Sequence, residues 1–366
     1  MKYRAEISSP LNARKEKPQS KAWVVTAWSQ ANRALLALLI CATPSLAQAG
    51  ATAMASAQSN TPPRLITSVQ PVQMIVSAIS HGISTPIVLL PPGSTPHEYS
   101  LKPSNVKHIS QADALFWIGP SLENFLSRTL KKFSRRSSLN VSALIDAPGL
   151  KLISLNDEHH HEHDHAQHDD AANTVAEHSD DAKAAEPAEH AAEHSDPHIW
   201  LDPDNALAMA RQVSQVLANL DPANAKRYQH NLSEFAQRIA KLHKQLQHKL
   251  MPIKNKGYFV FHDAYSYFEQ RYGLKRLGEF SVNESKPSVK KLMSIQSIIQ
   301  QGQAECVFSE PQFNPSLIHT VIRGTNVRQA TLDPLGDSYQ YGVDPSNHYF
   351  EFIEQFTNQF IGCLNQ

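Results

Sequence analysis

A long helical pattern occupies residues 203–250 and divides the sequence into two parts. Apolar residues recur every three or four positions, first over 206–220 and then over 225–250, where the pattern lasts about seven turns. Asp202 and Pro203 suit the start of the first helix, as its N-cap and its first helical residue. We therefore expect a long, stiff helix that bridges the parts of the chain on either side of it.

Short apolar runs typical of strands alternate with helical patterns on both sides of this bridge. Alternation of this kind predicts βαβ units around a parallel sheet, and hence one α/β lobe on each side. The expected fold class is α/β, with two (β/α) lobes joined by one long α-helix. We place the N-terminal lobe at residues 50–220, the linking helix at 221–250 and the C-terminal lobe at 251–366. The expected strands are 65–69, 86–90, 114–119, 258–261, 306–309 and 327–332, and the clearest helices between them are 72–79 and 288–301.

The first 49 residues have the three parts of an export signal. Basic residues precede a short apolar run at 34–42, and a small-x-small sequence ends at Ala49. We expect cleavage near Ala49 and export of the protein; the alternative is a buried N-terminal helix. Ile40 stands before Cys41, where a lipoprotein signal would have a small residue.

The charge balance excludes one class of partner. Lys and Arg number 34 and so do Asp and Glu, so the chain lacks the basic field of a nucleic-acid-binding protein. Removing residues 1–49 takes away seven basic and two acidic residues, which leaves 27 and 32. We therefore expect a mildly acidic exported protein that binds no nucleic acid.

Cys306 and Cys363 are the cysteines that remain after cleavage. An even pair in an exported protein favours one disulfide, which here would join the C-terminal helix to a strand. Two separate buried thiols are the alternative. A zinc site is disfavoured because the pair has no Cys-x-x-Cys spacing.

Residues 157–195 have a composition unlike the rest of the chain, with nine of the 19 histidines, twelve acidic residues and one lysine. The segment has no apolar period, so it cannot bury a core, and we expect disorder without a ligand. It spells His-Glu-x-x-His at 161–165, but a protease helix would need an apolar face that is missing here. We expect an auxiliary loop that gathers zinc weakly and passes it on or senses sufficiency; the alternative is a tolerated solvated insertion. Its histidines are His159, His160, His161, His163, His165, His168, His178, His190 and His194.

Three other histidines stand at the boundaries of expected elements. His97 follows the strand 86–90, His198 precedes the helix that begins near Pro203, and His262 follows the strand 258–261. Ligands of open α/β sheets bind near the carboxyl ends of strands, and imidazole is a preferred ligand of zinc. These three side chains are therefore the candidate ligands of a metal site.

The motifs around these histidines resemble those of a known family. In their order and spacing they are similar to the metal-binding solute receptors of ABC importers, and most closely to the periplasmic zinc-uptake binding proteins of Gram-negative bacteria. The resemblance covers essentially the whole chain after residue 49. The motifs are Leu-Leu-Pro-Pro-Gly through Pro-His-Glu-Tyr-Ser at 89–100, Asp-Pro-His-Ile-Trp-Leu at 196–201, Phe-His-Asp-Ala-Tyr at 261–265, Ser-Glu-Pro-Gln-Phe at 309–313 and Thr-Leu-Asp-Pro-Leu-Gly at 331–336.

The resemblance implies a metal site in the cleft between the lobes, with His97, His198 and His262 as zinc ligands. Some zinc receptors have an acid immediately before the first histidine, but Pro96 stands there in this chain. The resemblance favours Asp333 or a water as the fourth ligand, with Glu310 as a weaker candidate. It also supports a disulfide between Cys306 and Cys363.

Glu98 and Asp263 stand beside the expected ligands and are either residues that orient them or surface charges. The three nitrogen ligands favour zinc over manganese, which prefers more oxygen ligands.

The predicted function is capture of Zn²⁺ in the periplasm and its delivery to an ABC permease for high-affinity import. The sequence has no P-loop, so a separate ATPase must supply the energy. We expect a monomeric receptor that is not an enzyme, and a periplasmic zinc chaperone is a further possible partner. The alternatives are a manganese or iron receptor of the same family and, less favoured, a metal-storing adhesin or a zinc hydrolase.

Overall fold

The computed structural model describes residues 61–133, 138–155, 194–281 and 286–365. All of these residues belong to one compact unit, Ala57–Gln366. The predicted export signal lies outside the described residues, as does the His-rich segment apart from residues 194 and 195. Among the described helices, none is both long enough and apolar enough to cross a membrane.

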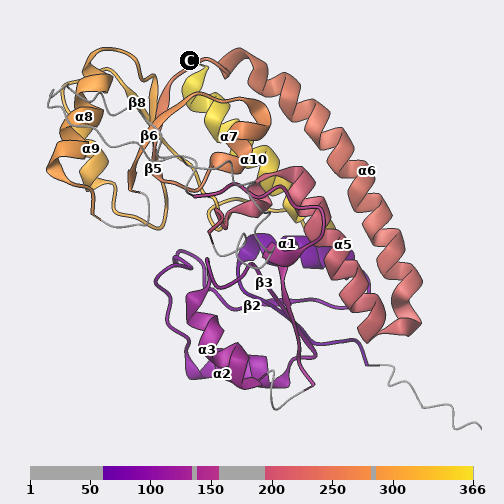
Figure 1. The fold of residues 1–366 in the computed structure, drawn as a ribbon. Coiled ribbons are helices and arrows are strands. Elements are labelled where there is room, and N and C mark those ends of the chain that lie inside the picture. Colours follow the sequence, from indigo (N-terminus) through magenta and orange to yellow (C-terminus); the bar gives the residue numbers. More distant parts are fainter. Residues whose placement is uncertain (1–60, 134–137, 156–193, 282–285, 366) are drawn as a thin grey trace, which may run out of the picture. The chain divides into compact units, whose positions relative to one another are not determined.

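The N-terminal lobe, coloured indigo to magenta in Figure 1, is built on a four-stranded parallel sheet with the order β2-β1-β3-β4. Ile66 in the central strand β1 lies opposite Ile87 on one side and Leu115 on the other. Parallel strands need crossover connections, and helices supply most of them. The elements are β1 (Leu65–Thr67), α1 (Gln70–Ile79), β2 (Ile87–Val88), α2 (Pro103–Gln111), β3 (Ala114–Trp117), α3 (Asn124–Phe133), β4 (Asn140–Ala143) and the 3₁₀ turn η1 (Leu144–Asp146).

The C-terminal lobe repeats this plan with the strand order β6-β5-β7-β8, again all parallel. Because all strands within each lobe are parallel, their carboxyl ends meet at one edge of the sheet. Two parallel α/β lobes confirm the predicted fold class. The elements are β5 (Tyr258–His262), α7 (Ser266–Tyr272), β6 (Arg276–Ser281), α8 (Val289–Gln300), β7 (Cys306–Ser309), α9 (Ser316–Ile322) and β8 (Arg328–Thr331).

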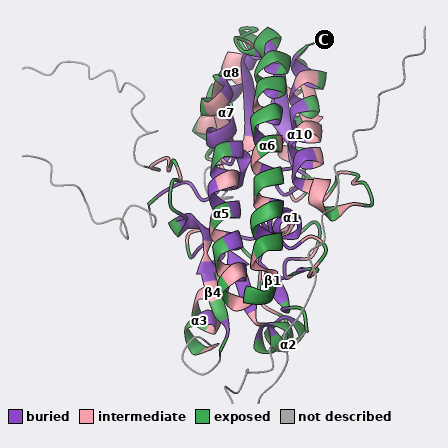
Figure 2. Ribbon diagram, turned by 90° about the vertical axis from the view of Figure 1, so that its right-hand side faces the viewer, coloured by how far each residue is buried: buried purple, intermediate pink, exposed green. Residues whose placement is uncertain are grey.

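Helices α5 (Pro203–Leu220) and α6 (Ala225–Leu250) connect the lobes. As predicted, the Asp202 carboxylate caps α5 by accepting a hydrogen bond from the Asp204 backbone N–H. With 26 residues, α6 is about 39 Å long. It packs against α5 and α1 of the N-terminal part and against α10 (His348–Leu364) of the C-terminal part. Its inward face is buried and its outward face is exposed (Figure 2). Short 3₁₀ turns complete the described elements: η2 (Ile199–Leu201), η3 (Pro222–Asn224), η4 (Met251–Ile253) and η5 (Pro345–Asn347).

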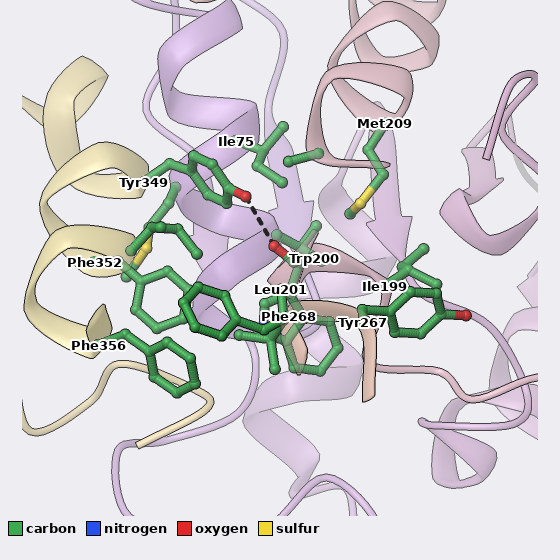
Figure 3. Packing of buried hydrophobic residues seen from close by; sticks show 14 of the residues in the cluster. Ile75, Ile199, Trp200, Leu201, Met209, Tyr267, Phe268, Tyr349, Phe352 and Phe356 are labelled. Carbon is green, nitrogen blue, oxygen red and sulfur yellow. Dashed lines mark hydrogen bonds between the residues drawn. The ribbon is translucent and has the colours of Figure 1, made fainter. Parts of the chain in front are cut away.

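One hydrophobic core runs through both lobes and the helices between them. It includes Val72 of α1, Phe235 of α6 and Phe308 of β7, and Trp200 lies within it. Figure 3 shows the rings of Phe268, Phe352 and Phe356 gathered near Trp200 and Ile75. Two smaller clusters lie within the separate lobes. Because the main core is shared, the boundaries drawn at 220 and 250 stay predictions, although α6 does end at Leu250.

A disulfide joins Cys306 of β7 to Cys363 of α10, with 6.2 Å between the two Cα atoms. The predicted pairing is therefore confirmed. The bond fixes the C-terminal helix to a central strand of the second sheet, across a sequence separation of 57 residues.

Candidate metal centre

Three separate pieces of backbone hold the three predicted histidines. His97 lies in the loop that follows β2, and His198 immediately precedes the turn η2. His262 is the last residue of β5. The two lobes therefore contribute one histidine each, from the loop after β2 and from the end of β5, and the segment before α5 contributes the third.

The structure brings these side chains together. The centres of the imidazole rings of His97 and His198 are 5.6 Å apart, and each lies within 5.3 Å of the ring of His262. One ring nitrogen from each residue lies within 4.8 Å of the others. Among the described residues, these three histidines form the group of His, Cys, Asp or Glu side chains that could hold one metal ion together. Three imidazole nitrogens converging on one point are typical of a zinc site.

Asp196 orients the ring of His198. The Asp196 Oδ1 atom lies 2.7 Å from His198 Nδ1 and also accepts a hydrogen bond of 2.9 Å from the His198 backbone N–H. When Nδ1 carries the proton and donates a hydrogen bond to the carboxylate, the lone pair of Nε2 is left for a metal. The Tyr267 hydroxyl of α7 donates to the Asp196 carbonyl oxygen at 2.7 Å, which holds this segment against the C-terminal lobe.

Glu310 stands in a similar relation to His262, at a longer distance. It directly follows β7, is buried, and places its Oε2 atom 3.7 Å from His262 Nδ1. The side chain also lines the cavity in front of the histidines. Two buried carboxylates thus lie near the imidazole cluster, one behind His198 and one beside His262.

Burial keeps His97 and His198 uncharged before a metal binds. Burial, together with the neighbouring rings of His198 and His262, lowers the pKa of His97 to about 2. Burial also lowers the pKa of His198 to about 3, and His262 acts in the same direction. Because a metal ion binds only deprotonated imidazole, the site holds its ligands in the binding form.

The cavity in front of the histidines is small. Its volume of about 20 Å³ compares with the 10–15 Å³ that one water molecule needs. Drug-sized ligands occupy sites of roughly 300 Å³ or more. The space therefore suits a single ion with one small ligand. It is lined by Thr95, Pro96, His97, His198, Trp200, His262, Glu310, Gln312, Phe313, Pro334 and Leu335.

A family model described as the periplasmic zinc-uptake complex component A, ZnuA, matches residues 65–363. The chain belongs to the ZnuA family. A high-affinity zinc uptake system protein ZnuA from Yersinia pestis is 38% identical over 301 residues, which cover 82% of this chain and 91% of that protein. Members of this family are solute-binding components rather than enzymes.

Solved structures show the same fold. A crystal structure of ZnuA matches with a TM-score of 0.63 at 22% identity, covering 82% of this chain and 99% of that one. The periplasmic zinc-binding protein TroA from Treponema pallidum matches with a TM-score of 0.65 at 19% identity, covering 83% and 99%. At these identities the likeness establishes the two-lobe architecture.

Asp333 has a different environment in this ZnuA-family chain from the one expected of a metal ligand. It is fully buried, but it lies outside the group of side chains within 4.8 Å of one another. Its Oδ1 accepts hydrogen bonds from the Gln312 side chain and the Leu335 backbone, each at 3.1 Å, and its Oδ2 accepts one of 2.7 Å from the Ser338 backbone. Three donors already surround the carboxylate, so its role as fourth ligand stays a prediction.

The structure describes both acidic residues that stand beside the expected ligands, and one histidine of the His-rich segment. Glu98 is exposed, whereas Asp263 forms an ion pair with Arg276 of β6. His194 is exposed, and its carbonyl oxygen accepts a hydrogen bond from the Leu155 backbone. The other eight histidines assigned to the auxiliary loop lie outside the described residues.

Asp196 and Trp200 have no role that was predicted from the sequence. The Trp200 indole donates from Nε1 to the Pro334 carbonyl oxygen at 2.8 Å, and the Trp200 carbonyl accepts from the Tyr349 hydroxyl at 2.8 Å (Figure 3). The Asp-x-His spacing was a usable signal for Asp196, since a carboxylate two residues away can reach an imidazole. No local signal pointed to the partners of Trp200, which lie 134 and 149 residues away.

Proposed function

We propose that this protein captures Zn²⁺ in the periplasm and delivers it to the permease of an ABC importer. The observation that carries the proposal is the convergence of three imidazoles, from both lobes, on a cavity of about 20 Å³. Membership of the ZnuA family supports zinc as the cargo and the periplasm as the location. Cleavage of the signal near Ala49 would accompany export.

In this proposal His97, His198 and His262 bind the ion, each through one ring nitrogen. A fourth position is left for a water or a carboxylate, for which Asp333 and Glu310 are the candidates. Glu310 has the better access, because it lines the cavity and Asp333 does not. Nitrogen-rich coordination favours zinc over manganese, and this distinguishes the proposal from a manganese receptor of the same fold.

The protein acts as a monomeric receptor and not as an enzyme. A hydrolase would need room for its substrate beside the metal, and the small volume of the cavity argues against that. Energy for import comes from a separate ATPase that drives the permease, and a periplasmic zinc chaperone is a possible donor of the ion. The His-rich segment 157–195 collects zinc weakly and supplies it to the cleft.

Zinc titration by calorimetry on the exported form tests this proposal. We compare the wild type, the triple variant His97→Ala/His198→Ala/His262→Ala, and a variant in which residues 157–193 are replaced by a short Gly-Ser linker. The matched control is His108→Ala/His248→Ala/His319→Ala, since these three histidines are exposed and belong to no ligand cluster among the described residues. We expect one tight site that survives the segment replacement and the control substitutions but disappears in the cleft triple variant.

Tight binding that disappears with the segment and persists without the three cleft histidines would reverse the assignment. It would favour a metal-storing protein. A parallel titration with Mn²⁺ tests the cargo, because an oxygen-rich manganese site would bind Mn²⁺ tightly, whereas a site of three imidazole nitrogens should bind Mn²⁺ far more weakly than zinc.

A further inference from the structure

The segment Asp333–Ser338 follows β8 and contacts both N-terminal pieces of the metal site; we name it the clasp segment. The Asp333 carboxylate stabilises the turn of the clasp segment, because it accepts hydrogen bonds from the backbone N–H groups of Leu335 and Ser338. The Tyr339 hydroxyl adds a contact of 3.2 Å to the Asp333 backbone N–H. The buried carboxylate thus acts as the centre around which the segment turns.

A glycine is required inside this turn. Gly336 has a φ of 75°, in the left-handed region that favours glycine. A Cβ atom at this position would collide with the Tyr341 hydroxyl and would lie 2.7 Å from the Phe352 ring. The Gly336 carbonyl oxygen accepts a hydrogen bond of 2.5 Å from that same hydroxyl. The clasp segment is therefore fixed to the core of the C-terminal lobe through side chains and close packing.

The outer end of the clasp segment reaches the loop that carries His97. Asp337 Oδ2 accepts a hydrogen bond of 3.0 Å from the Gly93 backbone N–H, across 244 residues of sequence. Within the loop, the Ser94 backbone N–H donates to the Pro91 carbonyl oxygen, and the His97 backbone N–H donates to Thr95 Oγ1. Those two bonds shape the loop itself, whereas the Asp337 bond ties the loop to the opposite lobe.

At the start of the clasp segment, Pro334 contacts Trp200, which lies two residues after His198. The Pro334 carbonyl oxygen accepts from Trp200 Nε1 at 2.8 Å in a buried contact. Pro334 and Leu335 also form part of the cavity wall. The same short segment therefore contacts the supports of two histidines that come from outside its own lobe.

We propose that Asp337 is a positioning residue for metal binding, which holds the His97 loop against the C-terminal lobe, and that Asp333 serves by holding Asp337 in place. The inference rests on the proposed function of the three histidines. Release of the ion requires the His97 loop to separate from His262 on the other lobe. The Gly93–Asp337 bond must break in that separation, so it slows dissociation of the metal.

The experiment measures zinc dissociation by stopped-flow chelator competition at pH 7.5. Burial raises the pKa of Asp337 to about 6, so the carboxylate is ionised at this pH. We expect Asp337→Ala to dissociate about 3- to 10-fold faster, which corresponds to the loss of one intramolecular hydrogen bond. Asp337→Asn should stay close to wild type, because the amide oxygen can still accept from Gly93. The matched control is Asp113→Ala, which removes an aspartate paired with Arg64 at the amino-terminal edge of the first sheet and should leave the rate unchanged.

The variant Asp333→Ala tests whether Asp333 positions Asp337 or binds the metal itself. It should accelerate zinc dissociation at least as much as Asp337→Ala, while the visible absorption spectrum of the Co²⁺-loaded protein keeps its band positions. A shifted Co²⁺ spectrum would show that Asp333 is a ligand and would overturn its positioning role. Unchanged dissociation in Asp337→Ala, or equally fast dissociation in the Ala and Asn variants, would overturn the role of Asp337. Failure of the proposed function has a different signature, namely tight zinc binding that persists without the three cleft histidines.

Discussion

At the scale of single residues, the site is defined by the contrast between buried imidazoles and a buried carboxylate. Burial lowers the pKa of His97 and His198, so neither holds a proton near neutral pH. Burial has the opposite effect on Asp196 and raises its pKa to about 7. The group whose proton competes with the metal is therefore the acid behind the ligand, rather than the ligand.

This contrast predicts how many protons zinc displaces. At pH 6 the free protein carries a proton on Asp196 but none on His97 or His198. A cation on His198 lowers the pKa of the adjacent Asp196, so binding should release about one proton from Asp196, and this should lower the affinity up to about tenfold per pH unit below pH 7. Three histidines with unperturbed pKa values near 6.5 would release about two at pH 6. Calorimetry in buffers of different ionisation enthalpy measures the number.

The matched variant for this measurement is Asp196→Asn, whose amide oxygen can still accept from His198 Nδ1. Proton release at pH 6 should fall by about one in this variant, with the zinc site retained. Release of two or more protons by the wild type would show that the imidazoles are protonated in the free protein, contrary to the effect of their burial.

The site residues that could be predicted from the sequence are those that stand within a local sequence motif. His97, His198 and His262 stand at element boundaries within recognisable motifs, and the structure brings them together. The contact between Asp337 and Gly93 had no such signal, because a single hydrogen bond across 244 residues leaves no periodicity. For Asp333, the motif was visible from the sequence, but the three donors that surround its carboxylate depend on the folded turn.

At the scale of elements, the predicted strands were those with strongly apolar runs. β3 and β7 are buried along their whole length, and their sequences are apolar enough to be seen. Sequence analysis did not predict β4 or β6. β4 has four residues, one of them an exposed asparagine, and β6 contains arginine, glycine and glutamate with only two buried positions. Tertiary pairing with the central strands determines these two elements, and local propensity does not.

The disulfide between β7 and α10 gives a prediction at this scale. Replacing both Cys306 and Cys363 by alanine should lower the free energy of unfolding by about 2–4 kcal/mol, since the bond closes a loop across 57 residues. Neither cysteine lines the cavity, so zinc affinity under native conditions should stay at the wild-type value. Urea unfolding and zinc titration of the same variant check the two parts.

Reduction provides the control for the disulfide. A thiol reductant should destabilise the wild type by a similar amount and leave the double alanine variant unaffected. A large loss of zinc affinity in the folded double variant would mean that α10 shapes the site directly, and the assignment of a purely stabilising role to this bond would then be wrong.

At the scale of the whole molecule, the two lobes and their helices are joined by one core. Leu65 and Phe116 of the first sheet belong to the same cluster as Val260 and Phe308 of the second. On α6, the Phe235 ring lies 5.6 Å from Tyr349 and 5.0 Å from Phe350 of α10. The linking helix is thus packed into the protein along its length. We therefore expect limited movement of the lobes, and the proposed opening of the His97 loop is a small local change of that kind.

A shared core predicts that the protein unfolds in one step. Differential scanning calorimetry of the metal-free exported form should give a single transition, with equal calorimetric and van't Hoff enthalpies. Phe235→Ala should cost about 3–5 kcal/mol and still give one transition, because both lobes lose support together. Free zinc at 100 times its dissociation constant should add about 2.7 kcal/mol of stability, and the cleft triple-histidine variant should lose this gain. Two resolved transitions, with only one of them moved by Phe235→Ala, would show that the lobes are separate domains and that the linking helix does not couple them.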